Sequence, residues 1–137
     1  MDRRMNVIVV FSPDRAKVLF CLRRKDPYKG KLNFVGGKIE PGEDSAHAAR
    51  RELEEETGLT PADIDLAHVL DMDYFYCSIH LEAWCGVMKH DVPLREEKNP
   101  LIWLPADGDF TDLARFAGNG SVDYVLRCVD EWWAAQG

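Results

Sequence analysis

The sequence lacks any apolar run long enough to cross a membrane, and it lacks the paired cysteines of a zinc or redox motif. A transmembrane helix needs about 20 apolar residues, whereas Met1–Arg4 leads only into the short stretch Met5–Phe11, without a signal-peptide core or cleavage site. Cys21, Cys77, Cys85 and Cys128 show no C-x-x-C spacing, which argues against structural zinc and thioredoxin-type chemistry. We therefore expect a soluble cytoplasmic protein with buried thiols and no membrane partner.

The sequence also lacks a net positive charge. It has 17 Lys and Arg against 24 Asp and Glu, a formal charge of −7, so we expect no polymeric nucleic acid as partner. Positive charge is nevertheless concentrated in residues 15–38, where Asp26 is the one acidic residue among many Lys and Arg. This window is either a solvated basic loop or a binding site for a small anion such as a phosphate chain.

The 137 residues suit one domain, spanning 1–137, with a core of its own. β-rich runs at Asn6–Phe11 and Val18–Arg23 flank a turn and predict a hairpin. Ser45–Thr57 has helical composition, with Asp44 as a plausible N-cap and Gly58 as the C-terminal stop. Strands and a helix thus alternate in the first half of the chain.

The second half continues this mixture. From Phe75 to Val87 the odd positions are apolar or small, which predicts one buried face of a long strand or hairpin. Leu101–Leu104 predicts another strand, and apolar residues at helical spacing from Val122 to Trp133 predict an amphipathic C-terminal helix. Its tryptophans belong either to the core or to a ligand site, and we favour the core. The fold class is α/β (α+β), with helices packed against a mixed sheet.

An unusual concentration of acidic residues lies at the end of the predicted helix. Glu52, Glu55 and Glu56 fall on a single helix face, where like charges repel and the negative end of the helix dipole disfavours anions. One interpretation is a solvated face with tolerated repulsion. The other is a bound cation, and carboxylates without His or Cys suit Mg²⁺ or Mn²⁺. Next to a basic loop, such a site indicates metal-assisted attack of water on a polyphosphate.

The same residues complete a known motif. Gly37, Glu43 after five further residues, and the run Arg51-Glu52-Leu53-x-Glu55-Glu56-x-Gly58-Leu59 after seven more resemble a complete Nudix box over residues 37–59. The resemblance implies a Nudix-type α/β/α sandwich that hydrolyses a nucleoside diphosphate linked to some other group. It also implies that Glu52 is the general base, that Arg51 orients the glutamates, and that Glu43 braces the turn before the helix. The metal ligands it implies are the carbonyl of Gly36 and the carboxylates of Glu52, Glu55, Glu56 and Glu97, with a solvated charge run as the alternative for Glu97.

Local likenesses indicate the MutT-like, oxidised-purine nucleoside triphosphatase type. Leu32–Lys38 resembles the W-N-x-x-G-G-K segment of such enzymes, in which the Asn reads the purine edge, although Leu32 replaces Trp and Val35 replaces the usual Pro. Phe116–Arg127 resembles their C-terminal segment and contains Asn119, which is either a base-reading residue or a turn residue. The candidate substrate-binding residues are Arg23, Asn33, Lys38 and Asn119.

We therefore expect Mg²⁺-dependent hydrolysis (Mn²⁺ is possible) of nucleoside triphosphates to monophosphate and pyrophosphate, with oxidised purines such as 8-oxo-dGTP preferred, in sanitation of the nucleotide pool. Other interpretations stay open. ADP-ribose hydrolases usually carry a Pro beyond the box, and none occurs between Pro61 and Pro93. Dinucleoside polyphosphate hydrolases usually carry a Tyr there, and Tyr74 and Tyr76 are present. A nucleotide-binding sensor without hydrolysis is a further class, which retention of every box carboxylate disfavours.

Overall fold

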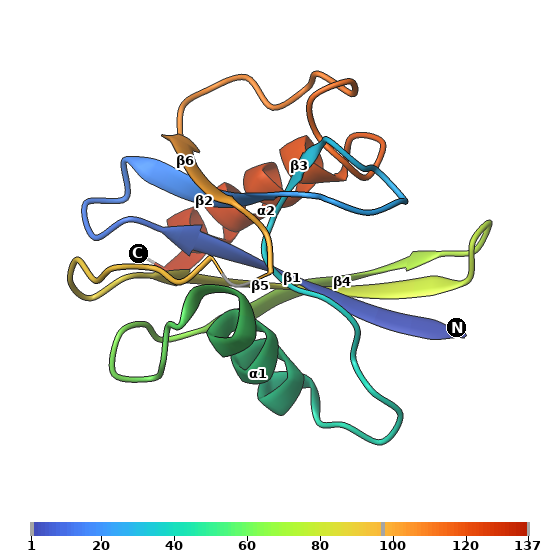
Figure 1. Cartoon of the computed structure of the whole chain (residues 1–137), viewed down its shortest axis with the longest axis horizontal. Coiled ribbons are helices and arrows are strands. Elements are labelled where there is room, and N and C mark those ends of the chain that lie inside the picture. The colour runs from blue at the N-terminus through green and yellow to red at the C-terminus, as the bar shows by residue number, and fades with distance from the viewer. Residues whose placement is uncertain (1, 97, 137) are drawn as a thin grey trace.

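A computed structural model of the chain describes residues 2–96 and 98–136. The sheet order is β3-β2-β1-β5-β4, and β6 also pairs with β2 (Figure 1). The elements, in chain order, are β1 (Arg3–Phe11), β2 (Lys17–Leu22), β3 (Leu32–Asn33), α1 (Ser45–Thr57), β4 (Ala67–Tyr74), β5 (Ile79–Val87), β6 (Leu101–Pro105) and α2 (Ser121–Gln136).

The sheet is mixed, and it splits next to β1. β1 runs parallel to β5 along its whole length, whereas its antiparallel pairing with β2 is recorded only at Phe11 and Val18. β2 then turns away to pair with β6 and β3, both antiparallel. The predicted hairpin between the first two strands is confirmed, and its early divergence separates two layers of strands (Figure 1).

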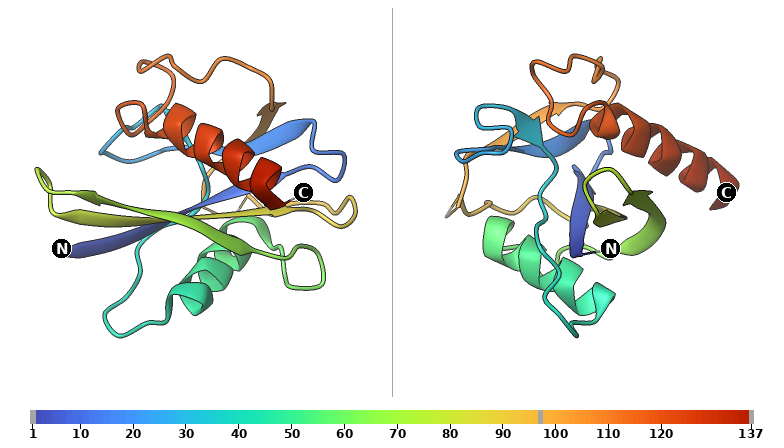
Figure 2. Two further views of the ribbon diagram at one scale, coloured as in Figure 1. Left: turned by 180° about the vertical axis from the view of Figure 1, so that it is seen from behind. Right: turned by 90° about the vertical axis from the view of Figure 1, so that its right-hand side faces the viewer.

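The sheet buries both of its faces, each under one helix (Figure 2). Successive side chains of a strand point to opposite faces, so Val7 and Val9 join the core under α2 while Ile8 and Val10 join the core under α1. This explains why the first strand is apolar at nearly every position rather than at alternate ones. The expected mixed sheet with helices on both faces is confirmed.

The ends of α1 are those that the sequence predicts. The Asp44 carboxylate accepts a hydrogen bond from the His47 backbone N–H at 3.1 Å, which caps one of the free amides of the first turn. Gly58 adopts the left-handed conformation, with φ of 81°, and its N–H donates to the Glu54 carbonyl at 2.8 Å. Glycine adopts this conformation readily because it has no Cβ, and the helix ends here, shortly after its last glutamates.

The prediction of one buried face over residues 75–87 is wrong in its first part. Phe75 is 83% exposed and lies with Cys77 in the turn between β4 and β5, and β4 itself precedes the predicted pattern. Trp84, at an even position, is buried like Cys85, because β5 lies between β1 and β4 with a helix on each face. An inner strand covered on both sides shows no simple alternation.

The apolar stripe of α2 is core, as expected. Val125 and Val129 are fully buried, and Trp132 and Trp133 pack partly buried against the same cluster. The Arg15 guanidinium lies 3.9 Å from the ring centre of Trp133, a cation–π contact that covers the outer face of the ring. Among residues 2–96 and 98–136, no helix has the length and apolar character needed to span a membrane.

The cysteines are free thiols, but only two are as buried as predicted. Cys21 and Cys85 are buried, and loss of hydration raises the pKa of Cys21 to about 12 and that of Cys85 to about 11. Cys77 and Cys128 are half-buried, since one lies in a turn and the other on the side of α2.

Candidate active site

The Gly36–Gly37 pair is held directly against β1. The Asn6 backbone N–H donates to the Gly37 carbonyl at 2.8 Å, and the Gly37 N–H donates to the Asn6 side-chain oxygen at 2.9 Å. A Cβ on Gly36 would collide with the Asn6 carbonyl oxygen, and the φ of 139° at Gly36 is itself unfavourable for other residues. Val35, which replaces the usual Pro, is fully buried and accepts from Ile8 N–H at 2.8 Å, so β1 holds the loop in place.

Two glutamates of α1 meet this glycine pair. The Gly36 N–H donates to Glu56 Oε2 at 2.7 Å. A Cβ on Gly37 would lie only 2.7 Å from Glu52 Oε2, so the missing side chain leaves room for that carboxylate. Three segments distant in sequence thus converge: the start of β1, the glycine loop and the C-terminal half of α1.

Both of these carboxylates are buried, and burial raises their pKa values. Glu52 and Glu56 are each 7% exposed. Burial raises the pKa of Glu56 to about 7, with the Gly36 N–H opposing the rise and the Glu52 charge adding to it. Burial also raises the pKa of Glu52, against the opposing charges of Lys98 and Arg51. Both carboxyls are therefore protonated more readily than those of exposed glutamates.

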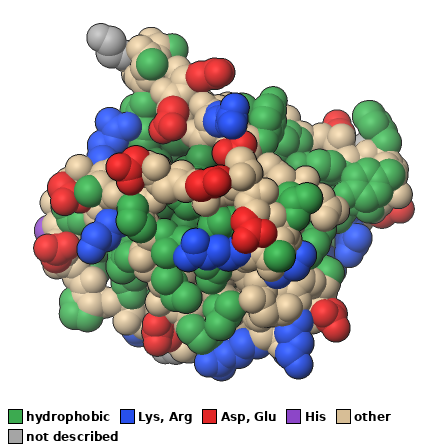
Figure 3. Space-filling model, turned by 90° about the horizontal axis from the view of Figure 1, so that it is seen from above, with side chains coloured by type: hydrophobic (Ala, Val, Ile, Leu, Met, Phe, Trp, Pro, Cys, Tyr) green, Lys and Arg blue, Asp and Glu red, His purple; other side chains and the backbone are tan. Residues whose placement is uncertain are grey.

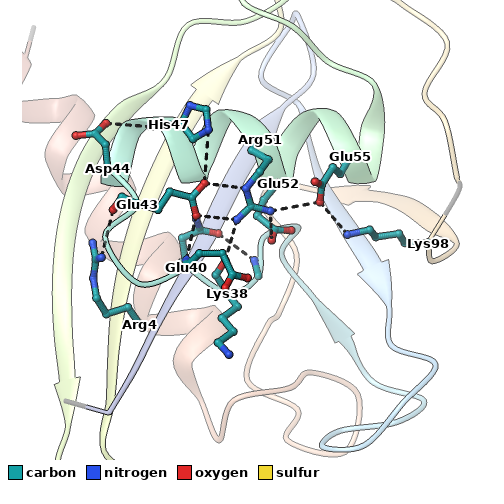
Figure 4. Close-up of polar contacts among 12 residues, drawn as sticks. Arg4, Lys38, Glu40, Glu43, Asp44, His47, Arg51, Glu52, Glu55 and Lys98 are labelled. Atoms are coloured by element: carbon teal, nitrogen blue, oxygen red, sulfur yellow. Dashed lines mark hydrogen bonds and ion pairs between the residues drawn. The ribbon is translucent and has the colours of Figure 1, made fainter.

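Arg51 links the acidic residues of the site (Figure 4). Its Nε and Nη2 donate to the two oxygens of Glu43 at 2.8 and 2.9 Å, a bidentate pair. Its Nη1 lies 3.1 Å from Glu52 Oε1 and 3.4 Å from Glu55 Oε2. The Glu43 carboxylate also accepts from the Glu40 N–H at 3.0 Å, at the turn before α1. Hydrogen bonds from Arg51 hold the pKa of Glu43 at about 2.

Glu55 is the most exposed of the three box glutamates. Its Oε2 accepts from Lys98 Nζ at 3.0 Å, and this bond lowers the Glu55 pKa and raises that of Lys98. The box glutamates do not form the tight group of potential metal donors that occurs within residues 2–96 and 98–136. That group lies on β4 and β5, where three donor atoms all lie within 4.8 Å of one another. A metal ion shared by all three box glutamates would therefore draw their oxygens closer together.

The other residues predicted for the site differ in how they are placed relative to the box glutamates. Arg23 Nε donates to the Pro27 carbonyl at 2.7 Å, and its charge opposes the rise in the Glu56 pKa. Lys38 is exposed, and its side chain points away from the glutamates, while its carbonyl accepts from Arg51 at 3.0 Å (Figure 4). Asn33 Oδ1 accepts from the adjacent Phe34 N–H at 2.9 Å. Glu97 lies outside the described residues.

The basic residues of the window 15–38 lie on different elements and have different partners. Lys17 begins β2, and Lys31 Nζ donates to the Leu113 carbonyl at 2.7 Å. On the face seen in Figure 3, positive and negative side chains are interspersed rather than separated. Within the window, the charge of Arg23 opposes the rise in the Glu56 pKa, whereas Lys31 is tied to a loop carbonyl.

Asn119 is a turn residue that also borders a cleft. It adopts a left-handed conformation with φ of 55°, between two glycines that also have positive φ. Both Asn119 and Tyr76 line this cleft. The cleft has a volume of about 420 Å³, within the range of small-molecule sites. Its lining residues are Met72, Tyr74, Tyr76, Gly118, Asn119, Gly120, Ser121 and Tyr124.

Sequence reasoning missed two residues of the site, Asn6 and Lys98. Asn6 is 2% exposed and positions the glycine loop. An isolated amide inside an otherwise apolar strand was the available signal, because a buried polar group needs partners. Lys98 follows two glutamates and precedes Asn99-Pro100, and nothing in that local sequence marks its contact with Glu55, 43 residues away.

Comparison with known proteins agrees with this geometry. Residues 2–117 match the NUDIX domain family. The 8-oxo-dGTP diphosphatase of Escherichia coli (strain K12) is 37% identical over 109 residues, which cover 79% of this chain and 84% of that enzyme. The oxidized purine nucleoside triphosphate hydrolase of Danio rerio is 41% identical over 67 residues, 49% of this chain and 40% of the relative.

Solved structures share the fold. An Ap4A hydrolase from C. elegans superposes with a TM-score of 0.74 at 18% identity, covering 96% of this chain and 98% of that one. A structure from the study of MutT of Aliivibrio salmonicida and Vibrio cholerae gives a TM-score of 0.69 at 22% identity, covering 94% and 97%. The family match over most of the chain, together with the intact acidic site, shows that the chain belongs to the Nudix family and is a Nudix hydrolase of the MutT type.

Proposed function

We propose that the protein hydrolyses (deoxy)nucleoside triphosphates to monophosphate and pyrophosphate, that it depends on Mg²⁺ or Mn²⁺, and that it prefers oxidised purines such as 8-oxo-dGTP. The observation that carries the proposal is the burial of Glu52 and Glu56 against the Gly36–Gly37 pair. Likeness to the E. coli 8-oxo-dGTP diphosphatase over most of both chains supports the substrate class. Sanitation of a cytoplasmic nucleotide pool is the physiological part of the same proposal.

The residues present fit a hard divalent cation. Two buried carboxylates with raised pKa values lie beside Gly36 and Gly37, which have no side chains. Oxygen donors without His or Cys are the ligands that Mg²⁺ prefers. Such an ion neutralises phosphate charge and polarises the bond to be broken. The residues that would hold it are Gly36, through its carbonyl, and Glu52, Glu55 and Glu56, with Glu97 as a further candidate.

Glu52 is the proposed general base. In the metal-free protein, burial raises the pKa of this carboxyl. Both of its oxygens lie close to Gly37, where a Cβ would be 2.7 Å from Oε2 and 2.8 Å from Oε1, and Oε1 also accepts from Arg51. In this proposal Arg51 fixes the carboxylate, so that Oε2 accepts the proton of the attacking water. Arg51 itself is fixed by Glu43, whose bidentate pairing leaves Nη1 for Glu52.

The cleft beside Asn119 is the proposed site of the nucleobase. Tyrosine faces provide a stacking surface for any base, and an amide can both donate and accept, which suits adjacent carbonyl and N–H groups of an oxidised purine. Asn119 lines this cleft. Asn33 follows Leu32, whose carbonyl accepts from the Ala117 N–H at 2.8 Å, so both candidate amides lie on neighbouring segments. Arg23 and Lys38 are proposed as contacts to the phosphates.

A second candidate substrate is a dinucleoside polyphosphate. Tyr74 and Tyr76 both line the cleft, and their rings meet edge to face at 6.2 Å between centres. Such a pair stacks a base without reading its edge, so it favours no particular purine. A nucleotide sensor without hydrolysis is a third candidate, and the intact acidic site disfavours it.

The test is a panel of oxidised and normal nucleoside triphosphates, ADP-ribose and diadenosine polyphosphates, with products identified for each. We expect pyrophosphate release to be fastest with 8-oxo-dGTP, and Glu52→Gln to lower kcat by about 10² to 10⁴ with the fold unchanged by circular dichroism. Asn119→Ala should reduce the preference for the oxidised purine while a generic triphosphate is still turned over. Faster turnover of diadenosine polyphosphates would replace the proposed substrate, and undiminished activity in Glu52→Gln would remove Glu52 as the base.

A further inference from the structure

His68, Asp71 and Glu82 form a compact group of donor atoms on the β4–β5 hairpin, outside the Nudix box. Each offers one potential ligand atom, and these atoms all lie within 4.8 Å of one another. His68 Nε2 and Asp71 Oδ1 are 2.6 Å apart, and Asp71 is the register partner of Glu82 across the strands. The pairing of β4 with β5 therefore brings the three side chains together.

Glu82 supplies independent evidence that a partner is missing. It is only 4% exposed. Its Oε2 is well occupied, with Ser45 Oγ at 3.0 Å, Arg4 Nη2 at 3.4 Å and His80 Nε2 at 3.4 Å. Its Oε1 is buried and has no hydrogen-bond partner among the described residues. An unpaired buried carboxylate oxygen is costly, so this atom indicates an absent cation or donor.

The charge around the group favours a cation. Asp71, Asp73 and Glu82 contribute three negative charges, and Arg4 contributes one positive charge, which leaves −2 when the imidazoles are neutral. His80 Nδ1 pairs with Asp73 at 2.7 Å, so that its Nε2 is directed at Glu82. A divalent ion bound by His68, Asp71 and a carboxylate oxygen of Glu82 would balance this charge.

The imidazole is already oriented for such a role. The His68 ring stacks on Trp84 with 4.5 Å between centres and 9° between planes, which restricts its rotation. Ligands of a tetrahedral zinc ion lie about 2.0 to 2.2 Å from it and hence about 3.3 Å from one another. Shifts of about 1 Å would convert the present hydrogen-bonded group into that geometry, with His68 binding through Nε2 as its Nδ1–H tautomer.

We propose that His68, Asp71 and Glu82 bind a divalent transition-metal ion of the zinc type, at a site separate from the box glutamates. One imidazole nitrogen with two carboxylates suits zinc, whereas the all-oxygen box suits magnesium. The separation follows from α1: Glu82 contacts Ser45 at the first residue of the helix, and Glu52 lies seven residues later, about 10 Å further along the axis. The ion would tie the β4–β5 hairpin together close to the start of α1.

The experiment is calorimetric titration of the metal-free full chain with ZnCl₂. We expect one binding event whose affinity falls at least about 10-fold in His68→Gln and in Asp71→Asn. The event should persist in His90→Gln, a matched control in which another exposed histidine, paired with Asp63 at 2.9 Å, is removed. It should also persist in Glu52→Gln, which disables the box. The visible absorption of the Co²⁺-loaded protein should be altered in His68→Gln and Asp71→Asn, which weaken zinc binding, and retained in the two variants that keep it.

The outcomes separate the alternatives. Loss of the zinc event in Glu52→Gln but not in His68→Gln would place the ion in the box and overturn the proposal. Absence of zinc binding in the wild type would also overturn it, and would leave Glu82 Oε1 to a buried water shared with its neighbour Asn6, whose Nδ2 is likewise unpaired among the described residues. Unchanged Mg²⁺-dependent hydrolysis in His68→Gln would show that this variant is folded, so a failure here is distinct from a failure of the proposed function.

Discussion

Replacing Glu56 by Gln should stabilise the metal-free protein at alkaline pH. In the unfolded chain this carboxyl titrates at its ordinary value of 4.5, whereas burial raises the folded pKa to about 7. Between these values the folded state binds more protons than the unfolded state, so stability falls as pH rises through the window. One pKa unit corresponds to about 1.4 kcal/mol, so the loss attributable to Glu56 is up to about 3 kcal/mol.

The glutamine variant removes this titration while keeping the local contact. Its amide oxygen can still accept the Gly36 N–H that Glu56 Oε2 now accepts at 2.7 Å. We therefore expect wild type and Glu56→Gln to have similar free energies of unfolding near pH 4.5. Near pH 8 the variant should be more stable by up to about 3 kcal/mol. Because the histidines titrate in both proteins, their contribution cancels in the comparison.

The assay is urea unfolding at several pH values in the presence of a chelator, repeated with excess Mg²⁺. Added Mg²⁺ should stabilise the wild type above pH 7 and the variant much less, because one proposed ligand is gone. Glu54→Gln is the matched control, since Glu54 is exposed on the same helix, and it should follow the wild-type pH profile. Parallel pH profiles for wild type and Glu56→Gln would refute the reasoning.

Two further predictions concern the surroundings of Glu52. Gly37→Ala places a Cβ 2.7 Å from the Glu52 carboxylate. The carboxylate must then shift by about 1 Å, which should lower kcat about 10²-fold. A kcat within twofold of wild type would show that Glu52 tolerates displacement. Arg51→Ala should raise the Glu43 pKa from about 2 toward 4.5, as followed by carboxyl NMR. The control Arg50→Ala should leave the Glu43 pKa at about 2, since Arg50 instead donates to the Ile64 carbonyl at 2.8 Å. An unchanged Glu43 pKa in Arg51→Ala would contradict the assigned pairing.

The sequence by itself determined the features that depend on a few neighbouring residues. The bounds of α1 follow from Asp44 and Gly58, which satisfy the free backbone groups at its two ends. The placement of the box glutamates on one helix face follows from the helical repeat. The intermixed strand-like and helical segments indicated helices against a mixed sheet, and the box spacing identified the family. Each of these signals is local, so no knowledge of the tertiary structure was needed.

Only the tertiary structure decided how buried those glutamates are and what they contact. The burial that sets the Glu56 pKa comes from the glycine loop, 20 residues away in sequence, and from β1 behind it. Register between β4 and β5 likewise decided that Glu82 is buried beside His68 and Asp71, although the local pattern placed only odd positions in the core. Such contacts depend on strand order and on which helix covers which face. Both are set by the packing of the whole chain, because a side chain buried on an inner strand contacts residues that no local repeat specifies.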